Sequence, residues 1–185
     1  MIRYASGILV ILAILFSSCE SNFNMGGPVY DQAGNLAIDS AKIAQYLEIA
    51  EYDSLYRIHD PSGVVVIVQE EGTGSRPSAS AGNTVHANYT GMLLDGTVFD
   101  TNLEAVAKEH DIYDEKRDYR LSSFPLIPGN QGGPIPGFTI GFTRMRSGSK
   151  GVILIPSPYG YQDQEMDRIP ANSVLVFEVD FLGFD

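Results

Sequence analysis

The hydrophobic pattern beyond residue 63 is typical of β-strands. Apolar and polar residues alternate with a period of two in residues 85–90 and 173–184, which predicts strands with one buried face. The β-branched run 64–68 and the apolar run 150–155 predict two further strands. Glycine and proline between these runs indicate turns, so the pattern favours a sheet domain.

A hairpin and a short helix complete this predicted domain. Asp95-Gly96 is typical of a two-residue turn that needs positive φ, and it would return residues 97–100 against the preceding strand. Residues 137–143 are expected to form a short helix. We therefore predict an α+β fold for residues 63–185, with an antiparallel sheet packed on that helix.

Residues 102–120 interrupt the strand pattern. The segment is charged and only partly helix-like, so we interpret it as an insertion. It would form either an exposed face or, alternatively, a charged docking surface.

An additional helix is expected before the sheet, within residues 19–62. Residues 40–51 place four apolar residues on one helical face, and Asp39 would be the N-cap. The face consists of Ile43, Tyr46, Leu47 and Ala50. It would pack on the main domain or on a partner, and residues 20–38, which have no sustained period, would form a tether.

The first 18 residues have the proportions of a secretory signal. Arg3 precedes an unbroken apolar run at residues 7–16, which is too short to cross a bilayer as a helix. The following Phe16-Ser17-Ser18-Cys19 resembles a bacterial lipobox, and Cys19 is the only cysteine. We expect Cys19 to be lipidated and to hold the protein on the periplasmic side of the inner or outer membrane. The alternative is an ordinary buried cysteine.

Composition narrows the function classes. The 185 residues suit one domain with an added terminal piece, and they contain 23 Asp and Glu against 12 Lys and Arg. A formal charge of -11 argues against a nucleic-acid partner. A single cysteine excludes a disulfide framework and a zinc site built on several thiolates.

Familiar catalytic and metal motifs are missing from the sequence. The three histidines are far apart, and no Gly-x-Ser-x-Gly elbow presents a serine nucleophile. Asp163, Glu165 and Asp167 resemble the start of a calcium loop, but its later glycine and glutamate are missing. We therefore expect neither a metal nor a cofactor.

Aromatic and aliphatic residues are the remaining candidates for a site. They fall at expected strand ends and in adjoining loops: Tyr89, Phe99, Phe124, Ile135, Phe138, Tyr159, Tyr161, Ile169 and Phe177. They would either pack as ordinary core or line a small apolar pocket with a few polar groups, chiefly Asp100 and the tyrosine hydroxyls. The pattern alone leaves both readings open.

Three ordered blocks carry a specific resemblance. The segment from Val85 to Asp100 (VHANYTGMLLDGTVFD) closely resembles the signature of FKBP-type peptidyl-prolyl isomerases. Two blocks support it: residues 135–148 (IPGFTIGFTRMRSG), and the span from 152–161 (VILIPSPYGY) through 169–179 (IPANSVLVFEV). The resemblance covers residues 63–185. With the leader and the insertion, the chain looks like FKBP-type lipoproteins of Gram-negative bacteria, some of them tied to gliding motility.

The resemblance implies a curved antiparallel sheet around a short helix, with the substrate proline in an apolar hollow between them. By matching position, the expected walls are Tyr89, Phe99 and Phe177, with Phe124 nearby and Phe138 as the floor. The Ile135 amide and the Tyr161 hydroxyl would bind substrate carbonyls, while Asp100 would lie beside the reacting amide. Ile169 would close the loop side.

Four departures from the family pattern are visible. Phe138 replaces the usual tryptophan, so FK506-like macrolides are expected to bind weakly. Either Arg117 or Arg120 would pair with Asp100, because the insertion blurs the alignment. Ser122 stands at a position that is usually aromatic. Residues 162–168 contain no aromatic residue or histidine that matches the family's lid contacts.

The predicted function is catalysis of cis-trans isomerisation at X–Pro bonds of extracytoplasmic proteins. An apolar hollow would remove water from the amide and so ease its rotation, which requires no nucleophile or cofactor. A binding module that grips proline segments or unfolded chains without catalysis is the alternative. A purely structural lipoprotein is a third reading.

Overall fold

The computed structural model describes residues 29–128 and 133–185. Seven antiparallel strands form one sheet in the order β1-β2-β6-β7-β3-β4, with β5 paired to β3. The strands are β1 (Tyr56–His59), β2 (Val65–Glu70), β3 (Thr84–Leu93), β4 (Val98–Thr101), β5 (Ser122–Pro125), β6 (Lys150–Ile155) and β7 (Leu175–Phe184). The helices are α1 (Gln32–Ile49), α2 (Glu104–Glu109) and α3 (Pro136–Arg144), with 3₁₀ turns η1 (Ala79–Ala81) and η2 (Ser157–Tyr159).

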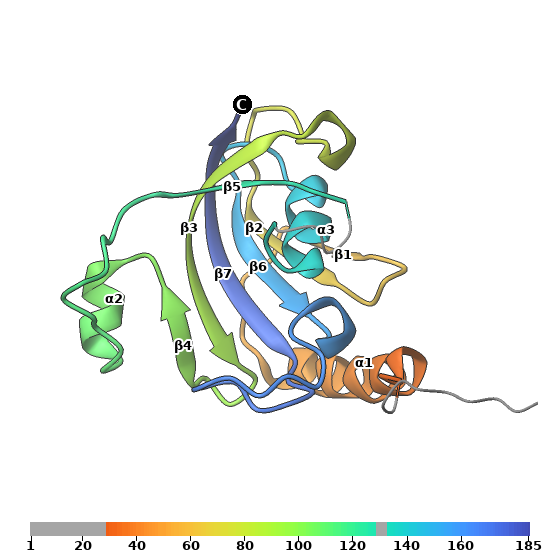
Figure 1. Cartoon of the computed structure of the whole chain (residues 1–185). Coiled ribbons are helices and arrows are strands. Elements are labelled where there is room, and N and C mark those ends of the chain that lie inside the picture. The colour runs from red at the N-terminus through yellow and green to blue at the C-terminus, as the bar shows by residue number, and fades with distance from the viewer. Residues whose placement is uncertain (1–28, 129–132) are drawn as a thin grey trace, which may run out of the picture.

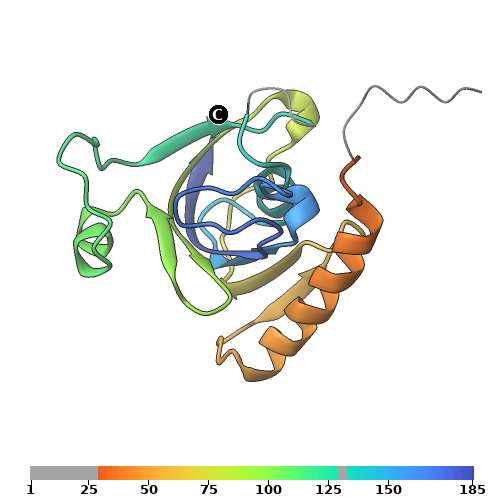
Figure 2. The same ribbon diagram turned by 60° about the horizontal axis from the view of Figure 1, so that its bottom comes forward.

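The sheet curves, and α3 lies on its concave side (Figure 1). Helix α1 lies against the outside of the sheet (Figure 2). This arrangement confirms the predicted fold class, including the additional N-terminal helix. The long strands β3 and β7 pair along their whole length, and they form the centre of the curve.

Both faces of β2 and β6 are buried, which explains the continuous apolar runs of these two strands in the sequence. In β2 and the residue before it, Val64, Val66 and Val68 face the inner core with α3. Val65 and Ile67 face the outer core under α1. A strand covered on one side only would show alternating polar residues here, so α1 is the reason for the unbroken run.

Helix α3 approaches β6 closely through two glycines. A Cβ on Gly137 would lie 2.2 Å from Ile155 Cγ2, and one on Gly141 would lie 2.7 Å from Ile153 Cδ1. No larger residue fits at either position without moving the helix away from the sheet. This contact sets the depth at which Phe138 and Phe142 enter the inner core.

Helix α1 differs from its prediction. It begins at Gln32, and its N-cap is Asp31, whose side chain accepts a hydrogen bond from the Gly34 amide at 2.9 Å. The predicted N-cap, Asp39, lies inside the helix and is completely buried. The predicted tether over 20–38 is therefore wrong from residue 32 onward. The apolar face was expected to pack on the main domain or on a partner, and the structure packs it on the main domain through Ile43, which is 3% exposed.

Two strands, β1 and β5, were absent from the sequence prediction. The insertion contains the short helix α2, which stands beside the sheet on the side away from α1 (Figure 1). Within residues 29–128 and 133–185, no helix is both long and apolar enough to cross a membrane. The predicted leader 1–18 and Cys19 lie outside the described residues.

Candidate active site

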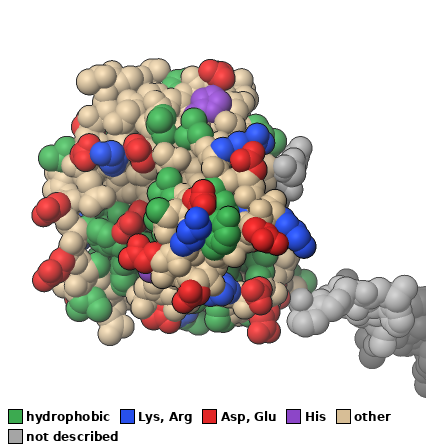
Figure 3. Space-filling view, turned by 90° about the vertical axis from the view of Figure 1, so that its left-hand side faces the viewer, with side chains coloured by type: hydrophobic (Ala, Val, Ile, Leu, Met, Phe, Trp, Pro, Cys, Tyr) green, Lys and Arg blue, Asp and Glu red, His purple; other side chains and the backbone are tan. Residues whose placement is uncertain are grey.

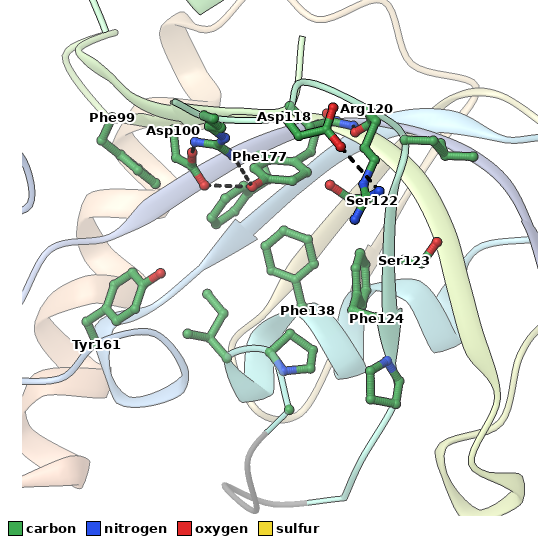
Figure 4. Close-up of a pocket in the computed structure, with 18 residues that line it drawn as sticks. Phe99, Asp100, Asp118, Arg120, Ser122, Ser123, Phe124, Phe138, Tyr161 and Phe177 are labelled. Carbon is green, nitrogen blue, oxygen red and sulfur yellow. Dashed lines mark hydrogen bonds and ion pairs between the residues drawn. The ribbon is translucent and has the colours of Figure 1, made fainter. Parts of the chain in front are cut away.

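A cavity of about 780 Å³ opens between the concave face of the sheet, β5 and the N-terminal end of α3. Figure 4 shows Phe138 and Phe177 at its centre, with Tyr161 and Phe124 on opposite sides. The cavity is lined by eight of the residues predicted from the sequence: Tyr89, Phe99, Asp100, Phe124, Ile135, Phe138, Tyr161 and Phe177. Of the candidate site residues that the structure describes, Ile169 and Tyr159 lie outside this lining.

Edge-to-face aromatic contacts hold the cavity wall together. The ring centroids of Phe138 and Phe177 are 4.4 Å apart, and those of Phe99 and Phe177 are 5.6 Å apart. Tyr89 meets Phe138 at 6.0 Å, also edge to face. Phe99 and Phe177 approach each other over Gly91 of β3, where a Cβ would lie within 2.8 Å of both rings.

Phe138 lines the cavity from α3, and the resemblance implies that it is the floor. It lies in the first turn of α3, is 7% exposed, and meets the ring of Phe124 at 5.5 Å. Ile135 is the N-cap residue of α3, so its backbone lies at the rim just before the helix. Pro136 at the first helical position fixes φ there and begins the helix.

A carboxylate, a phenol and a guanidinium form the polar side of the cavity. Tyr89 Oη donates to Asp100 Oδ2 at 2.6 Å, and Arg117 Nη1 donates to Asp100 Oδ1 at 2.5 Å. Arg117 Nη2 also lies 3.3 Å from Tyr89 Oη. Arg120 instead pairs with Asp118 at 3.2 Å. Of the two arginines left open by the sequence, Arg117 is therefore the partner of Asp100.

Protonation at this site follows from burial and charge. Burial, reinforced by the hydrogen bond to Asp100, raises the pKa of Tyr89, so its hydroxyl stays protonated and can donate. Partial burial opposes the charge on Arg117, but the hydrogen bond and charge of Asp100 outweigh it and raise the pKa of Arg117. Asp100 is thus bound by a neutral donor and a permanent cation.

Tyr161 faces the cavity from the opposite rim. It follows η2 in the chain, and its hydroxyl points toward the cavity in Figure 4. Burial, with the nearby charge of Asp100, raises the pKa of Tyr161. Its hydroxyl is therefore a neutral donor at physiological pH.

Ile169 lines an adjoining hollow of about 500 Å³ that shares Phe99, Asp100 and Tyr161 with the main cavity. The insertion reaches this hollow, where Arg168 Nη2 donates to the carbonyl of Asp111 at 3.2 Å. Figure 3 views the molecule from this side and shows apolar side chains interspersed with Asp and Glu. Chain flanking a ligand in the main cavity could extend into this second hollow.

Asn102 is a structural residue of the site that sequence reasoning missed. Its Oδ1 accepts from the Tyr89 amide at 2.8 Å, and its Nδ2 donates to the carbonyl of Arg120 at 3.0 Å. It therefore connects both ends of the insertion to β3 beside the cavity. The sequence gives no indication of this role of Asn102, because a lone asparagine after a strand resembles an ordinary turn residue.

The chemistry of this site lies in shape, apolar surface and a few directed hydrogen-bond donors. Within the described residues, no three His, Cys, Asp or Glu side chains gather as a metal-binding group. The cavity contains aromatic walls and a tyrosine–aspartate–arginine cluster, and it opens to solvent next to a second hollow. A curved antiparallel sheet around a short helix, with such a cavity between them, is typical of a protein with a binding site for a compact apolar group.

A comparison with protein-family models identifies the family. Residues 76–182, more than half of the chain, match the model of FKBP-type peptidyl-prolyl cis-trans isomerases. The chain belongs to this family. The matched region includes every described site residue named above.

Individual relatives agree with this result. The FKBP-type peptidyl-prolyl cis-trans isomerase FkpA of Aeromonas hydrophila is 36% identical over 124 residues, covering 67% of this chain and 39% of the relative. FK506-binding protein 4 of Saccharomyces cerevisiae is 35% identical over 114 residues, covering 62% and 25%. The crystal structure of FkpA from Escherichia coli has a TM-score of 0.58 and 29% identity, covering 83% of this chain and 62% of that one. The chain spans less than half the length of these curated relatives.

Proposed function

We propose that this chain catalyses cis-trans isomerisation of peptidyl-prolyl bonds in proline-containing polypeptides. The main support is the cavity itself, in which Tyr89, Phe99, Phe138 and Phe177 surround a space beside Asp100 and Tyr161. A proline ring is compact and apolar, and the amide that precedes it has no N–H to satisfy. A pocket of this shape and chemistry suits it.

The proposed mechanism depends on the polarity of the amide. Isomerisation must overcome a barrier of about 18–20 kcal/mol, because twisting the C–N bond removes amide resonance. The planar amide is more polar than the twisted one, so an apolar cavity removes more hydration from the planar form. Lowering the barrier by about 6 kcal/mol would give about 10⁴-fold acceleration.

Directed donors would add to this effect. Ile135 and Tyr161 both line the cavity, and in the proposed mechanism the Ile135 amide and the Tyr161 hydroxyl would bind carbonyl oxygens of the substrate backbone. Asp100, held by Tyr89 and Arg117, would present its charge beside the twisting amide without changing position during the reaction. Donors that fit only the twisted geometry stabilise the transition state selectively.

An isomerisation assay on a proline tetrapeptide tests the proposal, using residues 20–185. We expect acceleration over the uncatalysed rate, and its loss in the double variant Asp100→Val, Phe99→Ala with the fold retained by circular dichroism. Lys150→Gln is a matched control, because Lys150 pairs with Glu70 on the sheet outside both hollows. Absence of acceleration in the unaltered protein would refute the activity.

A second candidate function is holding of unfolded chains without catalysis. The second hollow favours it, because the insertion forms one of its borders and enlarges the surface next to the cavity. Suppression of client aggregation that survives the double variant, but not deletion of residues 103–119, would support this function. Suppression lost with the double variant would instead assign it to the proline cavity.

We further propose that the protein is a membrane-anchored lipoprotein acting on extracytoplasmic clients. The support is Cys19 after the apolar run at 7–16. Cys19→Ser should move the protein from the membrane fraction to the soluble fraction, and retention in the membrane would contradict lipidation.

FK506-like macrolides should bind weakly, because Phe138 offers a smaller floor than tryptophan. The link to gliding motility stays a prediction from resemblance.

A further inference from the structure

Asp39 is a buried carboxylate with no role in the proposed reaction. It lies in the middle of α1, and its residue is 0% exposed. Its Oδ2 accepts from the amide of Ser157 at 2.8 Å, and its Oδ1 accepts from Lys42 Nζ at 2.9 Å. A buried carboxylate is costly unless its contacts are well aligned, so this residue makes a specific, directional connection.

Ser157 transmits this connection to the loop that carries Tyr161. Its carbonyl accepts from the amides of Gly160 and Gln162, each at 3.0 Å. These two residues flank Tyr161 in the chain. The backbone on both sides of Tyr161 is therefore attached to one residue, whose own amide is attached to Asp39.

A second contact from the same part of the chain reaches Ser157. Tyr30 Oη lies 3.1 Å from Ser157 Oγ, so the chain on both sides of the α1 N-terminus bonds this residue. Ser157 is itself 0% exposed. Its amide, hydroxyl and carbonyl are all occupied, which leaves the turn little freedom to shift.

We propose that Asp39 is a positioning residue for Tyr161, and that α1 thereby controls the geometry of the catalytic pocket from the opposite face of the sheet. For its effect on catalysis, this inference rests on the proposed isomerase function. Loss of the Asp39 carboxylate leaves the Ser157 amide buried and unpaired, so the turn relaxes and the Tyr161 hydroxyl moves. A displacement of about 1 Å at a catalytic group is enough to lower the rate substantially.

The competing explanation is that Asp39 only fastens α1 to the sheet. Ile43→Ala separates the two explanations. Ile43 also holds α1 on the sheet through the outer core, but the side chains that hydrogen-bond Ser157 are those of Asp39 and Tyr30. Both Asp39→Ala and Ile43→Ala should lower the melting temperature. Only Asp39→Ala should disturb Tyr161.

A double-mutant cycle with the full chain in mild detergent measures this coupling. We expect Asp39→Ala to lower kcat/KM by about tenfold, and by less than about twofold in a Tyr161→Phe background, because the hydroxyl that it positions is then already gone. Ile43→Ala should lower kcat/KM equally in both backgrounds. Equal losses from Asp39→Ala in the two backgrounds would overturn the proposal.

A spectroscopic measurement keeps the inference independent of activity. In protein labelled with 3-fluorotyrosine, the fluorine NMR signal of Tyr161 is assigned by its loss in the Tyr161→Phe variant. It should shift or broaden in Asp39→Ala and stay unchanged in Ile43→Ala. An unchanged signal in Asp39→Ala would refute the positioning role, whereas a shifted signal in a protein without isomerase activity would refute only the proposed function.

Discussion

Gly91→Ala is the most direct test of the pocket geometry, because it adds a single methyl group behind the aromatic wall. The new Cβ would lie 2.6 Å from Phe177 Cε1 and 2.7 Å from Phe99 Cε2. Ordinary carbon contacts are about 3.5–4.0 Å long, so the rings must retreat by about 1 Å. Overpacking of this kind destabilises a protein by about 1–3 kcal/mol. Because both rings line the cavity, their shift also changes its shape.

The measurement combines kcat/KM on a proline tetrapeptide with a thermal melt. Gly183→Ala is the matched control, because Gly183 lies in the partner strand β7 and a Cβ there meets nothing within 4 Å. We expect Gly91→Ala to lose at least about tenfold in kcat/KM, since a misplacement of about 1 Å can cost about 100-fold. If Gly91→Ala isomerises the peptide as fast as Gly183→Ala, the two rings do not shape the site.

Three further predictions follow from charged and titrating groups. Arg117→Lys should lower kcat/KM, because lysine cannot bond Asp100 with a guanidinium fork. It should change the free energy of unfolding by less than about 1 kcal/mol. The control Arg120→Lys should change neither kcat/KM nor the free energy of unfolding. Burial raises the pKa of Tyr89, so above about pH 10 the unfolded chain loses the tyrosine proton before the folded chain does. The protein should therefore become less stable above about pH 10. Tyr89→Phe should weaken this loss of stability in thermal melts measured across pH. Burial opposes the charge of Asp60, but hydrogen bonds from Ser62 and Arg144 outweigh it and lower the pKa of Asp60. Asp60→Asn should therefore lower the free energy of unfolding by about 2 kcal/mol at pH 7. The difference should shrink as pH falls below about 4, where Asp60 itself becomes protonated. Denaturant unfolding measures this difference.

The central sheet could be predicted because its residues follow local rules, whereas the pocket walls were expected only from the resemblance to FKBP-type isomerases. Alternation in 85–90 and 173–184 places Tyr89 and Phe177 on one side of paired strands, and the structure pairs Gly91 with Phe177 directly. Pro136 at the first helical position is typical of a helix start, but local rules leave open whether Phe138 packs in the core or lines a cavity, so its place in the floor was expected from the resemblance.

The N-terminal helix shows where local rules fail. Both Asp31 and Asp39 are acceptable N-caps in sequence, and the choice depends on which one is buried. Asp39 accepts a hydrogen bond from Ser157, 118 residues away, and no periodicity in residues 32–49 reveals that partner. The pattern identified the correct buried face through Ile43 but placed the helix start too late.

The insertion shows a second kind of failure. Spacing could not separate Arg117 from Arg120, because residues 110–121 have no regular structure and side-chain direction there depends on long-range contacts. Strand β5 was missed for a similar reason. Its four residues form a strand only because β3 offers an edge for pairing at Val85 and Ala87.

Helix α1 also limits the distance between the pocket and an anchored N-terminal residue. Because α1 begins at Gln32 and is fastened to the sheet, a lipid on Cys19, as we propose, would be connected to α1 by a leash of residues 20–31 only. Fully extended, that leash spans at most about 40 Å. The pocket of a lipidated form would therefore stay close to the bilayer surface, and it would bind only clients that approach the membrane.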